Sequence, residues 1–176
     1  MARNDRPNML TPFLAGFLAW IVPGAGHVYL GRTLRGVILC VCINGLFWAG
    51  VAMGGVFTVE PVNSRWWFFA QMIAGASGVA SWHRQERDRR AIADEQGIPP
   101  RPPADEAGNA RWQRAFQKAA DEKGRWPAYP TDVTARAYSG IAGMLNLMCI
   151  FDAVLLASMG VMGEPAAGRK RPEAAA

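Results

Sequence analysis

An uncharged run from Val37 to Val59 is the feature that most limits what this chain can fold into. Asn44 is the only strongly polar side chain in this run. A helix needs about 20 predominantly apolar residues to cross the hydrocarbon core of a bilayer. The run is long enough, so it predicts a transmembrane helix rather than a strand or loop of a soluble domain.

Other apolar runs indicate that this helix is one of several. The chain alternates between apolar blocks and short polar turns, and 19% of its residues are charged, below the roughly 25% of soluble domains. We therefore expect an all-α integral membrane bundle of about four transmembrane helices in two hairpins. If residues 9–22 only enter the membrane and return, three spans remain. The predicted spans are about 11–30, 37–59, 66–82 and 138–163.

A polar segment separates the third predicted span from the last one. Residues 83–137 are rich in arginine and contain a proline cluster at 99–103, which predicts an extended linker. Between Ala104 and Lys123, Trp112, Phe116 and Ala119 recur at helical spacing and predict an amphipathic helix. This helix lies on the membrane, on the bundle or free in solvent. The predicted regions are an N-terminal membrane region at 1–82, a cytoplasmic loop at 83–137, a last span at 138–163 and a disordered tail at 164–176.

The distribution of positive charge gives the predicted orientation. The net charge is +5, which in a soluble protein would suggest nucleic acid, but lysine and arginine also collect beside membrane helices on the cytoplasmic side. With four spans, the turn 21–36 and the loop 83–137 share one side and carry most of these residues. We therefore expect the loop in the cytoplasm, the protein in the inner membrane and no nucleic-acid partner.

The first apolar run also has features of a secretory signal peptide. Arg3 and Arg6 precede the apolar residues 9–22, and small residues follow at 24–26. An uncleaved anchor fits the predicted hairpin better, so we take the segment as belonging to the mature bundle.

Few residues have the spacing of a metal, cofactor or catalytic site. The three cysteines lie in apolar runs, and the two histidines, His27 and His83, have no cluster of cysteines or carboxylates at ligand spacing. The glycines at 24, 26 and 31 superficially resemble a nucleotide loop, but no strand precedes them and no Gly-Lys-Ser/Thr follows. The sequence therefore predicts no metal, no cofactor and no catalytic residue.

Asp152 is the residue that most strongly suggests a functional role. It lies within an apolar segment in which Asn146 and Ser158 are the other polar residues. A carboxyl group is costly there, so it must face the bundle, become protonated or find a partner. Its candidate partners are Asn44, Gln71 and His27. We interpret Asp152 as a hydrogen-bonded clamp between helices; ion or proton handling and a position nearer the membrane surface are the alternatives.

The turn between the first two predicted spans supplies the other candidate residues. Its glycines, Gly24, Gly26 and Gly31, permit a chain reversal, and His27 is expected to hydrogen-bond within the turn. Tyr29 suits the headgroup level of the membrane. Arg32 and Arg35 are expected to reach cytoplasmic phosphates or carboxylates of the long loop.

This turn also carries a family resemblance. The pattern P-G-x-G-H-x-Y-L-G-R at residues 23–32 resembles the turn of the TM-two domain, a two-helix membrane hairpin. It is closer still to small bacterial membrane proteins that share a late A-G-x-L-N…D-A segment, which is similar to residues 142–146 and 152–153 here. The resemblance implies an integral membrane protein and does not imply a particular activity.

These observations lead to a non-enzymatic prediction. We expect a scaffold or partner-binding membrane subunit, embedded in the lipid bilayer and paired with another membrane protein or with a second copy of itself. The alternative is a small transporter or channel component that uses Asp152 and Asn146. A lipid-modifying enzyme is a third hypothesis, but no nucleophile beside a base is evident in the sequence.

Overall fold

The computed structural model describes residues 10–55, 58–59, 65–124 and 131–164. Within these ranges the chain is all-α, as the sequence predicted. The helices, in chain order, are α1 (Leu10–Ile21), α2 (Ala25–Tyr29), α3 (Thr33–Gly54), α4 (Arg65–Ile73), α5 (Ala76–Gln96), α6 (Glu106–Glu122) and α7 (Thr131–Ser158).

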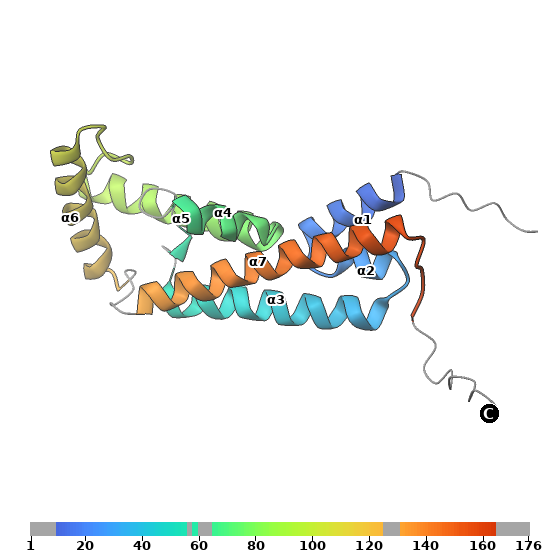
Figure 1. Ribbon diagram of the computed structural model, residues 1–176. Helices are drawn as coiled ribbons and strands as arrows, with labels where there is room; N and C mark the ends of the chain where they lie inside the picture. The colour runs from blue at the N-terminus through green and yellow to red at the C-terminus, as the bar shows by residue number, and fades with distance from the viewer. Residues whose placement is uncertain (1–9, 56–57, 60–64, 125–130, 165–176) are drawn as a thin grey trace, which may run out of the picture.

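Helices α3 and α7 form the long axis of the molecule and lie side by side in opposite directions (Figure 1). Gly50 and Gly54 let the helices approach closely, because a Cβ atom at either position would collide with α7 at Ala135. Among the described residues, Thr33–Gly54 and Val133–Ser158 are the two helical stretches long and apolar enough to cross a membrane. The described residues thus contain two candidate spans, and not clearly the four that the sequence predicted.

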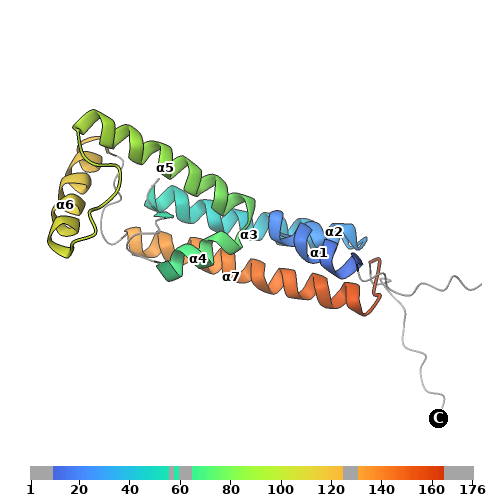
Figure 2. The same ribbon diagram turned by 90° about the horizontal axis from the view of Figure 1, so that it is seen from above.

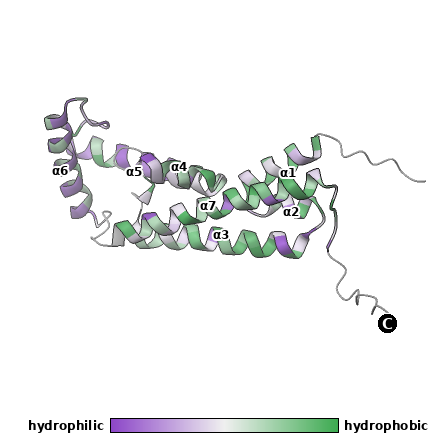
Figure 3. Cartoon of the chain, in the orientation of Figure 1, coloured by the Kyte–Doolittle hydropathy of each residue, from purple (hydrophilic) through white to green (hydrophobic). Residues whose placement is uncertain are grey.

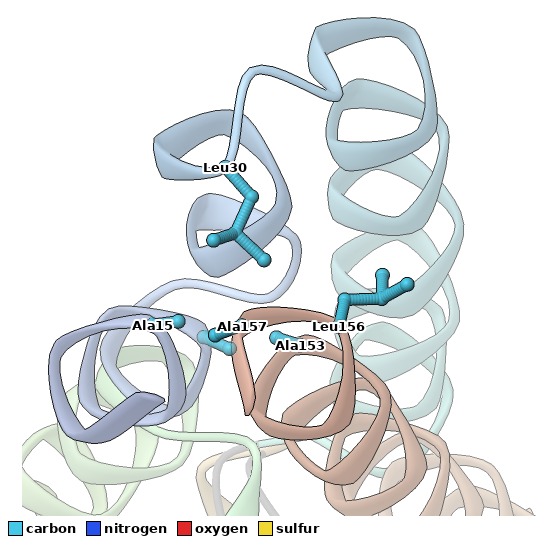
Figure 4. Close-up of a cluster of buried hydrophobic side chains, with 6 residues drawn as sticks. Ala15, Leu30, Ala153, Leu156 and Ala157 are labelled. Atoms are coloured by element: carbon cyan, nitrogen blue, oxygen red, sulfur yellow. The ribbon is translucent and has the colours of Figure 1, made fainter. Parts of the chain in front are cut away.

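The predicted first span, 11–30, is not one crossing helix. The chain reverses at Pro23 and Gly24, so α1 and α2 form a short hairpin whose open end lies at the start of α3. Proline has no N–H to continue a helix, and Gly24 has a φ of 86°. Figure 4 shows the apolar contacts of this hairpin: Ala15 of α1 and Leu30 after α2 meet Ala153, Leu156 and Ala157 of α7.

The predicted third span, 66–82, is also broken. Helix α4 ends at Ile73, and α5 turns back toward the end from which α4 came (Figure 2). Gly75 between them has a φ of 68°, and an added Cβ would collide with the carbonyl oxygen of Trp20 in α1. The tips of the two hairpins therefore meet near the middle of the bundle, one having entered from each end.

The polar segment is more helical than predicted. Helix α5 continues through His83, where the long loop was expected to begin, as far as Gln96. The predicted amphipathic helix is confirmed as α6. The side chain of Asp105, the residue before α6, caps the first turn by accepting a hydrogen bond from Gly108 N at 2.7 Å. Its apolar face packs on α5 rather than lying free; the buried cluster consists of Ile92, Trp112, Phe116, Ala119 and Ala120.

The α2–α3 turn and the α5–α6 unit lie at opposite ends of the molecule (Figures 1 and 2). The sequence predicted that the turn 21–36 and the long loop share one side, whereas the structure separates them by the length of the bundle. Figure 3 shows the same division in hydropathy: α1, α3 and most of α7 are apolar, whereas α6 and the outer half of α5 are hydrophilic.

The segment after α7 folds back on the α2–α3 turn. Gly163 N donates to Leu30 O at 2.8 Å, and Leu34 N donates to the Glu164 side chain at 2.9 Å. Glu164, predicted as the first residue of a disordered tail, is thus bonded to the start of α3. The rest of that predicted tail, 165–176, lies outside the described residues.

Candidate functional site

The α1–α2 hairpin places His27 inside the bundle. Close packing of α2 on α1 and α3 depends on Gly24 and Gly26, because a Cβ at Gly24 would collide with Gly36 O and one at Gly26 with Ala15 O. His27 is fully buried as a result. Its imidazole faces α7, so a residue of the glycine-rich turn reaches the C-terminal part of a helix that is distant in the sequence.

Asp152 is the centre of a three-helix cluster. His27 Nε2 lies 2.6 Å from Asp152 Oδ2, and Arg35 Nη2 lies 2.9 Å from the same oxygen. The three side chains come from α2, α3 and α7, so one carboxylate joins three helices. His27 is buried, whereas the side chains of Asp152 and Arg35 are 37% and 49% exposed. The cluster therefore lies at the side of the bundle rather than within a sealed core.

Cys149, one turn before Asp152, contacts the other nitrogen of the same imidazole. Its Sγ lies 3.7 Å from His27 Nδ1. When Nε2 donates its proton to the carboxylate, Nδ1 of a neutral imidazole is an acceptor and the thiol is the donor. The sequence did not indicate this nucleophile beside a base, because the two residues are 122 positions apart. Cys149 is 4% exposed, so the contact is inside the packed bundle.

Two of the three partners predicted for Asp152 bond elsewhere. Asn44 Oδ1 accepts from Ser77 Oγ at 2.6 Å, which joins α3 to α5. Gln71 Nε2 donates to Ser139 Oγ at 2.7 Å, which joins α4 to α7. His27 is the predicted partner that the structure brings to Asp152.

Asn146 has a similar joining role. Its Nδ2 donates to the backbone oxygen of Ile73 at 2.9 Å, at the C-terminal end of α4, where carbonyl groups have no partner in their own helix. Four polar side chains of the long helices, Asn44, Ser139, Asn146 and Asp152, thus have a common role. Each is bonded to a helix of one of the two broken pairs.

The remaining candidate residues lie around the α2–α3 turn. Tyr29 is 47% exposed on α2, and its interfacial role stays a prediction. Gly31 has a φ of 78° at the turn itself. Arg32 is 9% exposed, and its Nε has no hydrogen-bond partner.

The expected contact of Arg32 and Arg35 with the long loop is wrong. The described residues of that loop lie at the far end of the molecule, and Arg35 contacts Asp152 instead. The available signal was electrostatic: an arginine in the first turn of one apolar helix complements a lone carboxylate in another. The sequence did not show that these two helices are adjacent at that level.

Among the described residues, no group of three or more histidine, cysteine, aspartate and glutamate side chains is arranged to hold a metal ion. What the site contains is a carboxylate held between a cation and an imidazole, with a thiol behind the imidazole. This arrangement can fix helix positions or relay a proton between side chains.

The fold and this cluster define an all-helical protein. Two of its helices are long and apolar enough to cross a membrane, and two broken helix pairs pack against them. Residues 14–164 match DUF6677, a family of unknown function, and the chain belongs to that family. The matched region begins within α1 and includes the rest of both hairpins, the Asp152 cluster and Glu164. Neither the curated proteins nor the solved structures contain a match to this chain.

Proposed function

We propose that this protein is integral to the membrane, with α3 and α7 as its spans. The support is the apolar surface that the fold leaves uncovered. In the most apolar stretch of α3 only 22% of the residues are buried, and in that of α7 44% are buried. The core helix of a soluble protein is mostly buried. Exposed large side chains of these helices include Val37, Ile38, Val41, Met148, Phe151 and Leu155.

The two broken hairpins fit the same environment. At 1.5 Å per residue, α1 rises about 18 Å, roughly 60% of a hydrocarbon core of about 30 Å and too short to cross it. Backbone breaks at that depth are tolerated where protein groups cover them. The Asn146 side chain supplies such a group at the end of α4, and α1 covers the break at Gly75. The hairpins α1–α2 and α4–α5 would then enter from opposite faces and meet halfway.

Charge favours one orientation of this arrangement. Of the lysines and arginines that the structure describes, Arg32 and Arg35 lie at the α2–α3 end, and the others lie at the end formed by α5 and α6. The positive-inside tendency places the α5–α6 unit in the cytoplasm and the α2–α3 turn on the opposite side of the inner membrane. This keeps the predicted location of the long loop and reverses that of the turn.

Within the membrane the protein acts as a non-enzymatic scaffold or partner-binding subunit. The observation that carries this proposal is the balance of charge at Asp152, whose carboxylate is paired with Arg35 and hydrogen-bonded by His27. A paired charge costs much less to place among apolar helices than an unpaired one, so both partners must stay together and the helices that carry them are held in place. The clamp then sets the geometry of the bundle, and the α5–α6 unit is the region presented to a membrane-protein partner or a second copy.

The substitution Asp152→Asn tests the scaffold against its alternative. The purified protein is reconstituted into vesicles, and the decay of an imposed pH gradient is compared for wild type, Asp152→Asn and empty vesicles. A scaffold predicts that both proteins leave the decay unchanged and that Asp152→Asn unfolds at a lower temperature. Faster decay with wild type that the substitution abolishes would contradict the scaffold.

The alternative is a small transporter or channel component. The observation that favours it is the chain of contacts from Asp152 through His27 to Cys149, which joins a partly exposed carboxylate to a buried thiol. Such a chain is suited to carry a proton. Under this alternative the same experiment gives a wild-type flux that disappears in Asp152→Asn.

A further inference from the structure

An arginine-rich pocket of about 610 Å³ lies where α5 leaves the apolar bundle. Arg87, Arg89 and Arg90 of α5 and Arg101 of the connection to α6 line it, and Glu86 is the acidic residue among them. Four arginines against one carboxylate leave the lining strongly positive. The neighbouring pocket shares Arg90 and Arg101 but also contains Asp94, so the excess of positive charge is on the side of Trp82 and Arg87.

Arg89 is the most informative residue of this pocket. It is 6% exposed, and its Nη2 has no hydrogen-bond partner in the structure. Its Nη1 lies 3.6 Å from Glu86 Oε2, and Glu86 Oε1 also accepts from Arg90 Nε at 3.1 Å. Two arginines thus share one carboxylate, and one of them is buried with an unused donor. An unpaired donor on a buried cation is costly, and because Arg89 also lines the pocket, an anion bound there would relieve this cost once the side chain turned toward it.

We propose that this pocket binds a phosphate group. Guanidinium groups recognise phosphate through paired N–H donors, and several of them converge here from two segments of the chain. Trp82 forms part of the wall, and indole rings favour the headgroup level of a bilayer. The phosphate is carried by an anionic lipid headgroup or by a free phosphate-bearing solute.

The position of the pocket favours the lipid source. Arg84, within the same turns of α5, lines a separate groove with Trp48, Val51 and Gly55 at the C-terminal end of α3. The pocket is therefore at the level where α3 ends, which is the membrane surface if α3 spans. The lipid source rests on the proposed membrane insertion, whereas the phosphate site itself does not.

The test measures binding by the full chain in a mild detergent. Phosphatidylglycerol, phosphatidylethanolamine and inorganic phosphate are titrated separately, and the midpoint of thermal unfolding is followed. Phosphatidylglycerol is expected to raise the midpoint and phosphatidylethanolamine to leave it unchanged. Arg101→Gln and Arg87→Gln, both at exposed positions, are each expected to weaken this response about tenfold, the factor that corresponds to about 1.4 kcal/mol.

A matched control removes the same charge outside the pocket. Arg114→Gln, on the exposed face of α6, should respond as wild type does. Arg89→Gln should abolish the response, and because this buried position also affects folding, the two exposed variants decide the result. A response to inorganic phosphate that the same variants lose assigns the site to a free phosphate. Equal responses of wild type, Arg87→Gln and Arg101→Gln, or no response to either phosphate source, would overturn the proposal.

Discussion

Asp152 accepts a hydrogen bond from His27 Nε2 at 2.6 Å, although the two residues are 125 positions apart. This contact closes the α1–α2 hairpin onto α7, and Arg35 completes it from α3. The short glycine-rich turn is therefore held to both long helices, which also pack directly on each other at Gly50 and Gly54. That relationship, and the packing around it, can be tested residue by residue.

The ion pair between Arg35 and Asp152 should show energetic coupling. Arg35→Gln and Asp152→Asn are each expected to reduce the free energy of unfolding by about 1 kcal/mol, less than for a fully buried charged hydrogen bond because both side chains are partly exposed. The double variant should lose less than the sum of the two, because the second change removes a partner already lost. Ser158→Ala, an exposed position on the same helix, serves as the reference; strictly additive losses would argue against the pair.

His27 should protect the thiol of Cys149. In a background with Cys40→Ala and Cys42→Ala, the folded protein is expected to react slowly with a maleimide, because Cys149 is 4% exposed. His27→Ala opens space beside the sulfur and should accelerate the reaction. His27→Gln keeps a donor for Asp152 and fills more of the space, so its rate should fall between the two. A rapid reaction without any change at His27 would show that the thiol is not packed as described.

The two glycines Gly24 and Gly45 should respond in opposite ways to alanine. Gly24 has a φ of 86° and faces Gly36 O, so Gly24→Ala should strongly destabilise the hairpin. Gly45 lies within α3 with nothing near an added Cβ, and alanine there gains roughly 0.5–1 kcal/mol of helix preference. Thermal unfolding of the two purified variants makes the comparison. Equal effects would mean that the α1–α2 turn is not formed as described.

Trp112 should hold the α5–α6 unit together without affecting the bundle. Its ring stacks on Phe116 with centroids 5.0 Å apart, and its Nε1 donates to Pro99 O at 2.6 Å. Trp112→Ala is expected to cost this unit about 3–5 kcal/mol. Limited proteolysis should then cut the 97–105 connection faster, whereas the variant Gln117→Ala on the exposed face should be cut as wild type is. Protection that survives Trp112→Ala would place the stability of this unit elsewhere.

The sequence predicted the helices better than it predicted their paths. Hydropathy identifies 11–30 and 66–82 as apolar, but it does not register a reversal when both arms of a hairpin are apolar. The breaks depend on single positions: Gly24 beside Gly36 in one hairpin, and Gly75 beside Trp20 in the other. These contacts join residues from different helices, so no local pattern contains them.

The candidate site was only partly predictable for a similar reason. A carboxyl group in an apolar run is visible in one sequence, and so is the need for a partner. His27 was among three predicted partners for Asp152, but the choice between them required the position of the α1–α2 hairpin. Arg35 was missed because the predicted topology placed its side chain near the long loop, at what is the opposite end of the structure.

The most direct test of the two-span arrangement is to determine, by cysteine labelling, on which side of the membrane each of two segments lies. Thr33→Cys at the start of α3 and Ala104→Cys in the connection to α6 are exposed positions at opposite ends of the structure. Each is placed in a background with alanine at Cys40 and Cys42, and intact cells are treated with a membrane-impermeant maleimide. Two spans predict labelling of Thr33→Cys in intact cells and of Ala104→Cys only after the membrane is opened. Labelling of both positions from the same side would contradict the two-span arrangement and would agree with the three or four spans predicted from the sequence.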